Sequence, residues 1–224
     1  MSIVIAIDGP AGTGKSTVAR AVAAKLGLEY FDTGATYRVA ALHCLREGIN
    51  LNNTDDVAAM VSTMNVEMRL DPANPVVVLD DEDVSRLLHT DTISLIVSDV
   101  ATNLAARAVL GDMQRRVIAA SRKGAGIVAE GRDITSVIAP EAEVRVLLTA
   151  DDEVRVARRA GDGADPVTVR EAVLGRDRKD ATVVEFHTAA DGVVQIDTTD
   201  LTIDEVVLAV VRLAEAQLAE EASE

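Results

Sequence analysis

The chain has 224 residues, of which 48% are hydrophobic and 2% aromatic with no Trp, so it is long enough for one α/β domain with insertions around an aliphatic core. Its formal net charge of −15 argues against the clustered basic surface that nucleic-acid-binding proteins need. The single cysteine, Cys44, excludes a disulfide framework within the chain and a thiolate metal cluster.

The chain opens with the pattern of a strand, a glycine-rich loop and a helix. Residues 3–7 (IVIAI) are a short β-branched run that predicts a buried strand, and residues 18–26 predict a helix that stops at Gly27. Between them, residues 9–17 (GPAGTGKST) match G-x-x-x-x-G-K-[ST], the phosphate-binding loop. A preceding strand and a following helix are the context that this motif needs.

The residue types of this loop suit a nucleotide polyphosphate. Glycines let the backbone approach phosphate oxygens closely, and the loop N–H groups and the helix N-terminus offer donors and partial positive charge. Lys15 would place its ammonium group on the β- and γ-phosphates, and Ser16 would hold Mg²⁺ through its hydroxyl group. The alternative is a glycine turn that only packs the helix against the sheet.

The rest of the chain alternates between strand and helix patterns, which predicts a parallel sheet flanked by helices. First come a strand over 28–31, helices over 35–47 and 54–63, and an antiparallel hairpin with strands over 66–70 and 76–79. Then come two helical pieces within 91–122, strands over 126–130 and 143–149, two helices within 151–180 joined by a mobile loop at 161–163, a strand over 193–197 and an amphipathic helix over 203–220. The hairpin interrupts the parallel pattern, so we expect it to form a lobe beside the core.

Three further segments narrow the substrate. The first, residues 32–38 (DTGATYR), follows the second strand and opens a helix, so we expect it to face the same cleft as the phosphate loop. The hydroxyl group of Thr33 and the guanidinium group of Arg38 suit a sugar or base contact and a second phosphate. The alternative is a helix N-cap at Asp32 or Thr33 and a surface arginine.

The second segment is EGRD at 130–133, at the carboxyl end of a predicted central strand. Ligands of open α/β sheets bind at such ends. Arg132 and Asp133 could there fix a phosphate and an amino-bearing base edge together. The alternative is a structural ion pair at the end of the strand.

The third segment is a basic cluster of Arg155, Arg158, Arg159, Arg170, Arg176 and Arg178. Its spacing puts several guanidinium groups on neighbouring helical turns, which is unusual in so acidic a chain. Phosphoryl transfer needs positive charge around the moving group, and arginine supplies it with bidentate geometry. The alternative is a solvated helix face balanced by Asp151, Asp152, Asp177 and Asp180.

Taken together, these residues resemble the bacterial cytidylate kinases, the CMP and dCMP kinases of the nucleoside monophosphate (NMP) kinase group. The likeness covers nearly the whole chain and lies in four segments, in order and spacing: 7–16 (IDGPAGTGKS), 32–38, the hairpin followed by 82–85 (EDVS), and 130–133. The first two together are quite specific to that family. The hairpin insertion is absent from the short adenylate kinases.

The resemblance implies a P-loop NTPase-type α/β fold, a five-stranded parallel sheet flanked by helices. It adds an inserted NMP-binding lobe with a small antiparallel sheet, and a mobile lid. The implied division is a P-loop core over 1–34, 108–150 and 181–224, an NMP-binding insertion over 35–107 and a lid region over 151–180. The implied reaction is phosphorylation of CMP and dCMP to CDP and dCDP by ATP, with Mg²⁺ held at Ser16. The implied partners are free nucleotides, with no nucleic acid and no membrane, and a monomer is expected.

The family's site residues carry over position by position. ATP would bind Gly9, Pro10, Ala11, Gly12, Thr13, Gly14, Lys15, Ser16 and Thr17. CMP would bind Thr33 near the ribose, Arg38 at the phosphate, Ser98 and Arg107 at the cytosine end, Arg132 at the acceptor phosphate, Asp133 at the cytosine amino group, and Arg176 and Asp180 at the ribose and acceptor phosphate. The catalytic groups would be Lys15, Arg132, Arg158 and Arg159, the last two closing from the lid on the ATP phosphates.

The chain departs from the family's pattern at several positions. The family commonly continues Gly-Arg-Asp with Ile-Gly-Thr-Val-Val-Phe-Pro, whereas residues 134–140 have the sequence ITSVIAP. Val183 stands where another arginine is expected, and the usual Pro-Leu pair after it is missing. The lid over 155–176 is short, and the helix near 104 lacks its usual proline. These changes bear on the grip on the acceptor phosphate and on turnover more than on the fold.

Two other functions stay open on the sequence alone. One is a different P-loop kinase that acts on UMP, shikimate or another small acceptor. The other is a nucleotide-binding regulator, or a degenerate kinase that binds CMP without turning it over, which the missing arginine at position 183 would explain. The sequence has no Asn-Lys-x-Asp motif, which argues against a GTPase switch.

The sequence also gives an expectation for the compartment. No apolar run reaches membrane-spanning length, and the first residues lead directly into the predicted strand, so we expect no signal peptide. One cysteine fits a reducing compartment. We therefore expect a cytoplasmic protein.

Overall fold

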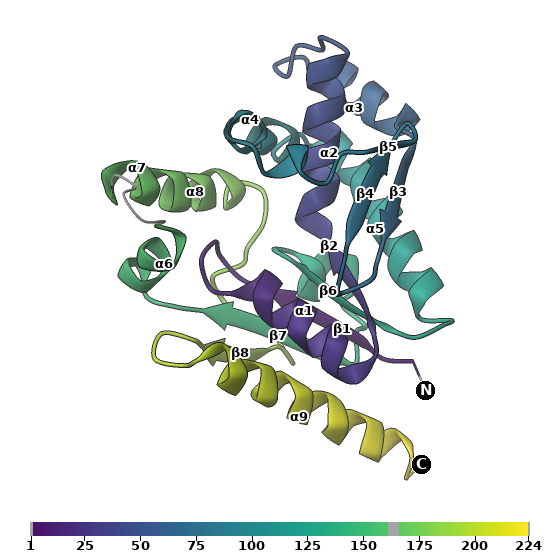
Figure 1. Cartoon of the computed structure of the whole chain (residues 1–224), viewed down its shortest axis with the longest axis vertical. Helices are drawn as coiled ribbons and strands as arrows, with labels where there is room; N and C mark the ends of the chain where they lie inside the picture. Colours follow the sequence, from purple (N-terminus) through teal and green to yellow (C-terminus); the bar gives the residue numbers. More distant parts are fainter. Residues whose placement is uncertain (1, 161–165, 224) are drawn as a thin grey trace.

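A computed structural model describes residues 2–160 and 166–223. Its main sheet has five strands in the order β2-β6-β1-β7-β8, and every pairing between them is parallel (Figure 1). The strands are β1 (Val4–Asp8), β2 (Glu29–Asp32), β6 (Ile127–Gly131), β7 (Val144–Thr149) and β8 (Val194–Asp197). The predicted fold class and the five predicted strands of this sheet are confirmed.

Helices cover both faces of this sheet, so the central strand is apolar along almost its whole length. On one face, α1 (Lys15–Leu26) and α9 (Ile203–Glu221) pack on Ile5 and Ile7 of β1 and on Val146 of β7. On the other face, α5 (Leu104–Ser121) and the π-helical turn η2 (Ile134–Ile138) pack on Ala6 and Ala129. The polar ends of β1 and β6 therefore emerge together at one edge, where the phosphate loop begins.

The inserted lobe follows β2 in the chain. It contains α2 (Thr33–Arg46), α3 (Thr54–Thr63), β3 (Val66–Arg69), β4 (Val76–Leu79), β5 (Glu82–Asp83), the 3₁₀ turn η1 (Leu87–His89) and α4 (Asp91–Ala101). The strands form an antiparallel sheet in the order β3-β4-β5, which confirms the predicted hairpin and adds a third strand. That strand has two residues, too few to show an alternating pattern. The turn before it uses positive φ at Asp80 (49°) and Asp81 (67°) in place of the glycine that usually marks such a turn.

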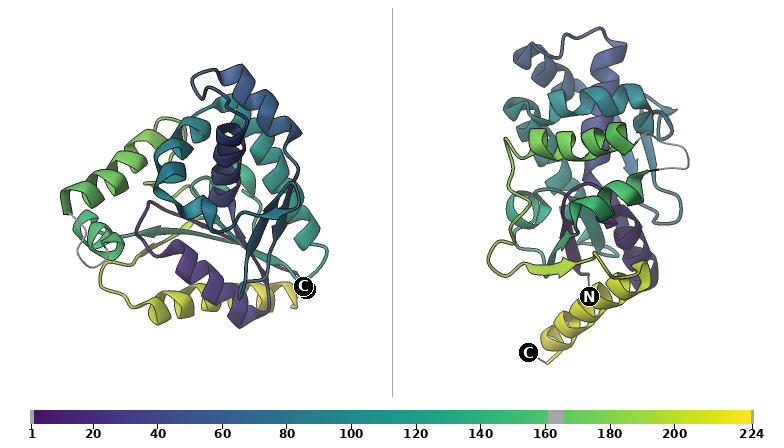
Figure 2. Two further views of the ribbon diagram at one scale, coloured as in Figure 1. Left: turned by 45° about the horizontal axis from the view of Figure 1, so that its top comes forward. Right: turned by 90° about the vertical axis from the view of Figure 1, so that its left-hand side faces the viewer.

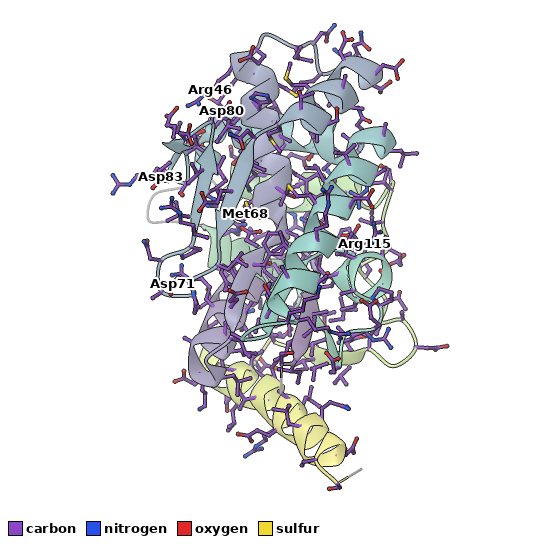
Figure 3. All side chains as sticks on the ribbon, turned by 90° about the vertical axis from the view of Figure 1, so that its right-hand side faces the viewer. Arg46, Met68, Asp71, Asp80, Asp83 and Arg115 are labelled. Carbon is purple, nitrogen blue, oxygen red and sulfur yellow. The ribbon has the colours of Figure 1, made fainter. Side chains whose placement is uncertain are left out.

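The hairpin is tied to the main sheet at its β3–β4 turn. The backbone N–H of Tyr30 in β2 donates to Leu70 O at 2.8 Å. Arg20 of α1 donates to Pro72 O at 3.0 Å and to Ala73 O at 3.2 Å. Figure 3 shows Asp71 at this end of the hairpin, beside α1, and Asp80 and Arg46 at the far end. The lobe therefore rests on the edge strand β2 and on the phosphate-loop helix.

A run of short helices lies at the carboxyl ends of the strands (Figures 1 and 2). α6 (Asp152–Arg159) follows β7, and α7 (Pro166–Arg170), the π-helical stretch η3 (Glu171–Gly175) and α8 (Arg176–Asp180) follow each other without a break. α8 packs against α4 of the inserted lobe. The two predicted helical pieces of 151–180 are confirmed, and the expected loop at 161–163 lies outside the described residues.

One helix begins earlier than predicted, and one predicted break between helices is confirmed, each for a local reason. α2 begins at Thr33, two residues early, because the Asp32 side chain accepts from Ala35 N at 3.2 Å and caps the helix. Asn103 caps α5 through bonds from Ala105 N and Ala106 N, so the helical region 91–122 breaks there. Within residues 2–160 and 166–223, no single helix is long and apolar enough to cross a membrane. α4 and α5 pass that test only as a pair, which is bent by 100°.

Candidate functional site

The phosphate loop joins β1 to α1 with positive φ at Gly9, Gly12 and Gly14, and at the first two a Cβ would also collide with neighbouring backbone. Gly9 has φ 147°, and a Cβ there would lie 2.1 Å from Leu148 O. Gly12 has φ 84°, and a Cβ there would lie 2.6 Å from Arg155 O of α6. The loop is therefore wedged between β7 and α6, with its open side at the N-terminus of α1.

Lys15 folds back over this loop. Its Nζ donates to Pro10 O at 2.8 Å. Burial lowers the pKa of Lys15, and Arg132 and Arg176 add to the effect, while Glu130 opposes it. A bound polyphosphate would relieve this crowding of positive charge, because it would place anionic oxygens among the three cations.

A buried carboxylate faces the first turn of α1. Glu130, at the end of β6 and 3% exposed, accepts from Ser16 Oγ at 2.6 Å and from Tyr30 Oη at 3.1 Å. Burial raises the pKa of Glu130 to about 7, and Asp32 contributes to the rise while Lys15 opposes it. Burial likewise raises the pKa of Asp32. A cation bound beside the Ser16 hydroxyl group would stabilise the ionised form of both carboxylates, Glu130 and Asp32.

This oxygen set fits Mg²⁺, which takes hydroxyl and carboxylate ligands and keeps several waters. Sequence reasoning assigned only Ser16 to the metal and missed Glu130 and Asp32. The signal available was that both follow strands at the same sheet edge as the phosphate loop. Within the described part of the chain, no three His, Cys, Asp or Glu residues form a self-contained metal cluster. The residues therefore suit a metal ion that arrives with a nucleotide.

A cleft of about 200 Å³ opens beside this group, between α1, β2 and the inserted hairpin. Its wall includes Ser16 and Asp32, together with Arg20, Arg69 and His89. Ser16 and Asp32 are thus reached from the hairpin side of the molecule.

Three arginines gather on the other side of the loop. Arg132 donates from Nη1 to Asp177 Oδ1 at 2.6 Å, its Nε lies 2.9 Å from Asp180 Oδ2, and its guanidinium carbon lies 4.5 Å from the centre of the Phe186 ring. Burial lowers the pKa of Arg176 to about 10, and Arg38 and Arg132 lower it further by their charges. Burial also lowers the pKa of Arg38. The structure thus brings these three predicted residues together as a partly buried cationic cluster.

Two atoms in this cluster are buried and unsatisfied. Arg176 Nε and Asp180 Oδ1 have no hydrogen-bond partner among the described residues, and Arg176 Nε lies 3.6 Å from Asp180 Oδ2. Arg38, by contrast, donates to Leu88 O at 2.9 Å and to Ser94 Oγ at 3.2 Å. Buried polar atoms without a partner are costly, so a ligand that satisfies them gains affinity.

Arg107 and Asp133 form an ion pair between α5 and the turn after β6. Arg107 also donates to Ala101 O at 2.9 Å, and its guanidinium carbon lies 5.4 Å from the centre of the Tyr37 ring. Ser98 is buried on α4, and Thr33 donates from Oγ1 to Glu130 O at 2.8 Å. The pairing of Arg107 with Asp133 presents a donor and an acceptor side by side at the far end of the cationic cluster.

One carboxylate, Asp177, connects the phosphate loop with Arg132 of the cationic cluster and with Arg155 of α6. It is 3% exposed and accepts from Ala11 N of the phosphate loop at 3.2 Å, from Arg132 and from Arg155. Burial alone would raise the pKa of Asp177, but Arg132 and Arg155 outweigh it and hold this pKa below its usual range. Arg155 also donates to Ala11 O at 2.9 Å. Sequence reasoning treated Asp177 only as a balancing charge and gave Arg155 no role of its own.

Comparison with known proteins supplies the family. A family model described as cytidylate kinase matches residues 5–216. The chain belongs to the cytidylate kinase family. A cytidylate kinase of Streptomyces griseus subsp. griseus is 40% identical over 219 residues, which cover 96% of this chain and 94% of the relative. One of Corynebacterium diphtheriae is 41% identical over 221 residues, covering 95% and 94%.

Solved structures agree with the fold. The shikimate kinase of Bacteroides thetaiotaomicron superposes with a TM-score of 0.50 at 14% identity, covering 95% of this chain and 98% of that one. An uncharacterized protein of Eubacterium ventriosum gives a TM-score of 0.53 at 13% identity, covering 96% and 99%. At such identities the likeness concerns the fold alone.

The arginines expected to close on ATP point in different directions. Arg158 donates to Thr198 Oγ1 at 3.0 Å and to Thr198 O at 2.6 Å, and Thr198 Oγ1 in turn donates to Thr13 O at 3.2 Å. Arg159 is exposed, and its charge lowers the pKa of Arg38 and of Arg176. Arg158 is therefore linked through Thr198 to Thr13 of the phosphate loop, and Arg159 lies close enough to the cationic cluster to act on it by its charge.

The family's arginine position is filled by a side chain that carries no charge. Val183 follows α8, and its backbone N–H donates to Asp180 O at 3.2 Å. The unpaired Asp180 Oδ1 lies one helical turn before it. Val183 therefore adds no positive charge after α8, where the resemblance leads us to expect an arginine.

Proposed function

We propose that this chain transfers the γ-phosphoryl group of ATP to CMP and dCMP, giving ADP with CDP or dCDP. The proposal rests on membership of the cytidylate kinase family and on one observation, that the carboxylate of Asp177 is shared by the two halves of the site. Ala11 of the phosphate loop and Arg132 of the turn after β6 both bind it. A polyphosphate in the loop and a phosphate on Arg132 would therefore be neighbours.

On the donor side, residues 9–17 would hold the ATP phosphates through backbone N–H groups, and Lys15 would exchange its bond to Pro10 O for the β- and γ-phosphates. The residues that would hold Mg²⁺ are Ser16 directly and Glu130 and Asp32 directly or through water. When bound there, Mg²⁺ would supply positive charge to the phosphate oxygens.

On the acceptor side, Arg38, Arg132 and Arg176 would bind the CMP phosphate, with Arg132 giving up part of its pairing to Asp177 and Asp180. The unsatisfied Arg176 Nε and Asp180 Oδ1 are suited to the phosphate and to a ribose hydroxyl group. Thr33 would lie near the ribose.

Base choice would rest on Asp133, supported by Arg107 and Ser98. The Asp133 carboxylate would accept from the cytosine amino group. Uracil has a carbonyl oxygen at that position, so UMP would place one acceptor against another. A site built to bind a donor discriminates strongly against an analogue that lacks it.

The chemistry needs no general base. The second pKa of a phosphate monoester is about 6, so the acceptor oxygen is already anionic at neutral pH and can attack in line. Lys15 and the arginines would stabilise the charge that develops on the transferred group.

We propose 151–180 as a lid that carries Arg158 and Arg159 toward the ATP phosphates, 35–107 as the NMP-binding insertion, and 1–34, 108–150 and 181–224 as the core. Closing would exchange the bonds of Arg158 to Thr198 for phosphate contacts.

The working unit in this proposal is a monomer acting on free nucleotides. The net charge of −15 supports small anionic ligands held by a local cationic cluster over a nucleic-acid partner.

An acceptor panel tests the proposal. ADP release would be measured with ATP, Mg²⁺ and each of CMP, dCMP, UMP, AMP and shikimate, and we expect CMP and dCMP to be preferred.

Lys15→Met should lower kcat by on the order of 100-fold or more, because one fixed charge at the transferred group is lost. Lys25→Met, at the exposed end of the same helix, is the matched control. Preference for another acceptor would overturn the assignment. Tight CMP binding without ADP release would favour a binding protein.

A further inference from the structure

The turn that carries Arg132 and Asp133 is fastened to the central strand by one side chain. Asp8 is the last residue of β1, directly before Gly9 of the phosphate loop, and it is 2% exposed. Its carboxylate accepts from Ile134 N at 3.0 Å, from Thr135 N at 2.7 Å and from Thr135 Oγ1 at 2.7 Å. One carboxylate thus spans the gap between the donor loop and the acceptor turn.

We propose that Asp8 and Thr135 are positioning residues, whose hydrogen bonds set the location of Arg132 and Asp133 relative to the phosphate loop. Neither side chain contacts the nucleotides in the proposed function, on which the kinetic part of this inference rests. Their effect would be geometric, because transfer between two bound phosphates is sensitive to small errors in alignment.

The local backbone explains why the turn depends on Asp8. η2 is a single π-helical turn, in which Val137 N and Ile138 N donate to Asp133 O, and Ala139 N donates to Ile134 O. The N–H groups of Ile134 and Thr135 come before the first of these bonds. The Asp8 carboxylate satisfies both of them, and no element other than β1 offers them a partner within the described residues.

The side chain of Thr135 makes the third bond. Its residue is buried, and its hydroxyl group donates to the oxygen that also accepts from its own backbone N–H. A residue without a hydroxyl group at this position would keep the backbone bond alone. Thr135 therefore adds a side-chain bond to the two backbone bonds that hold the turn on Asp8.

The hydrogen bond from the Thr135 hydroxyl group to Asp8 affects the pKa of Asp8, so it can be measured by titration. Burial raises the pKa of Asp8 to about 6, Asp133 adds to the rise, and the bonds from Thr135 and Ile134 oppose it. From β7, Arg145 faces the same region and donates to Thr135 O at 3.3 Å. Glu130 pairs in register with Ile7 and binds Ser16, on the α1 side of the sheet. Loss of the Thr135 hydroxyl group would therefore raise the pKa of Asp8 further.

Three variants test the proposal. Thr135→Val keeps the shape and removes the hydroxyl group, Thr135→Ser restores it, and Ser136→Ala, on the exposed neighbour, is the control. In Thr135→Val we expect the carboxyl ¹³C titration of Asp8 to move up by about half to one pH unit, the magnitude of one lost hydrogen bond. We also expect the backbone amide shifts of Arg132 and Asp133 to change, and KM for CMP to rise by roughly threefold to tenfold with KM for ATP within about twofold. Thr135→Ser and Ser136→Ala should resemble the wild type.

Each outcome bears on a separate claim. An unchanged Asp8 titration in Thr135→Val would show that the bond is absent and would overturn the proposal. A raised Asp8 pKa with unchanged amide shifts of Arg132 and Asp133 would show a bond that does not position the turn, and would also overturn it. Failure of the wild type to phosphorylate CMP would refute the proposed function alone, because the titration and the amide shifts need no turnover.

Discussion

At the scale of single residues, Asp177 has the most demanding environment in the site. It is buried between Arg132 and Arg155 and also binds the backbone of the phosphate loop. A buried ion pair gains little over an apolar core, but removing one partner leaves the other charge unpaired and costs about 3 to 5 kcal/mol. The carboxylate should therefore be important for keeping the site assembled.

Asp177→Asn tests this assignment by urea unfolding. We expect it to lower the free energy of unfolding by about 3 kcal/mol or more, because Arg132 and Arg155 lose the buried carboxylate that they share. Asp112→Asn breaks the exposed i,i+3 pair with Arg115 and should cost less than about 1 kcal/mol. Equal effects of the two substitutions would contradict the central position given to Asp177.

The sequence identified the motif residues but missed the side chains that hold them. Lys15, Arg38, Arg132 and Arg176 belong to local patterns that predict phosphate binding, and the structure brings their charges together. Asp8, Glu130 and Asp177 act through partners 22 to 166 residues away. Such contacts depend on which strand and helix ends meet, which no local pattern contains. The role of each residue stays a prediction.

At the scale of elements, periodicity predicted long segments well and short ones poorly. The three inner strands of the main sheet, β1, β6 and β7, are largely buried on both faces, so nearly continuous apolar runs indicated them. The helix over 54–63 has the predicted bounds. The two-residue strand β5 and the π-helical segments η2 and η3 were missed, since they are too short or too irregular to repeat a period.

The start of α2 shows a competition between two signals. The hydrophobic pattern placed the start at 35, whereas the Asp32 cap moves it to Thr33. The alternative of an N-cap at Asp32 is therefore confirmed, while binding roles for Thr33 and Arg38 stay predictions. The same Asp32 carboxylate also contributes to the raised pKa of Glu130.

At the scale of the whole molecule, the distribution of charge matters more than its sum. The chain carries a net charge of −15, yet Lys15, Arg38, Arg132 and Arg176 converge on one edge of the sheet. Lids and clefts with one sign of charge raise the local concentration of the opposite ion. The cationic cluster would therefore attract small phosphates at short range, while the net negative charge of the chain would repel larger polyanions.

The buried carboxylates should also shape the dependence of stability on pH. The pKa of Glu130 is about 7 in the folded chain, above the ordinary value of 4.5, so the folded state holds a proton that the unfolded state has lost. Its stabilising contribution is complete below about pH 4.5 and is lost as the pH rises through 7. Glu130→Gln has no ionisable group at this position, so it should not show this loss of stability as the pH rises.

Unfolding of both proteins across pH 4.5 to 7 measures the effect. We expect the wild type to lose roughly 3 kcal/mol relative to Glu130→Gln over this range. Glu141→Gln, at an exposed position, is the control, and its difference from the wild type should change little. A flat difference for Glu130→Gln would contradict the burial of an ionisable group beside Ser16.

The most direct measurement is a crystal structure with CMP, Mg²⁺ and a non-hydrolysable ATP analogue bound together. We predict the polyphosphate in the loop at 9–17, the CMP phosphate on Arg38, Arg132 and Arg176, and the cytosine amino group on Asp133. CMP bound elsewhere, or Arg132 still paired with both Asp177 and Asp180 while CMP is bound, would contradict the account.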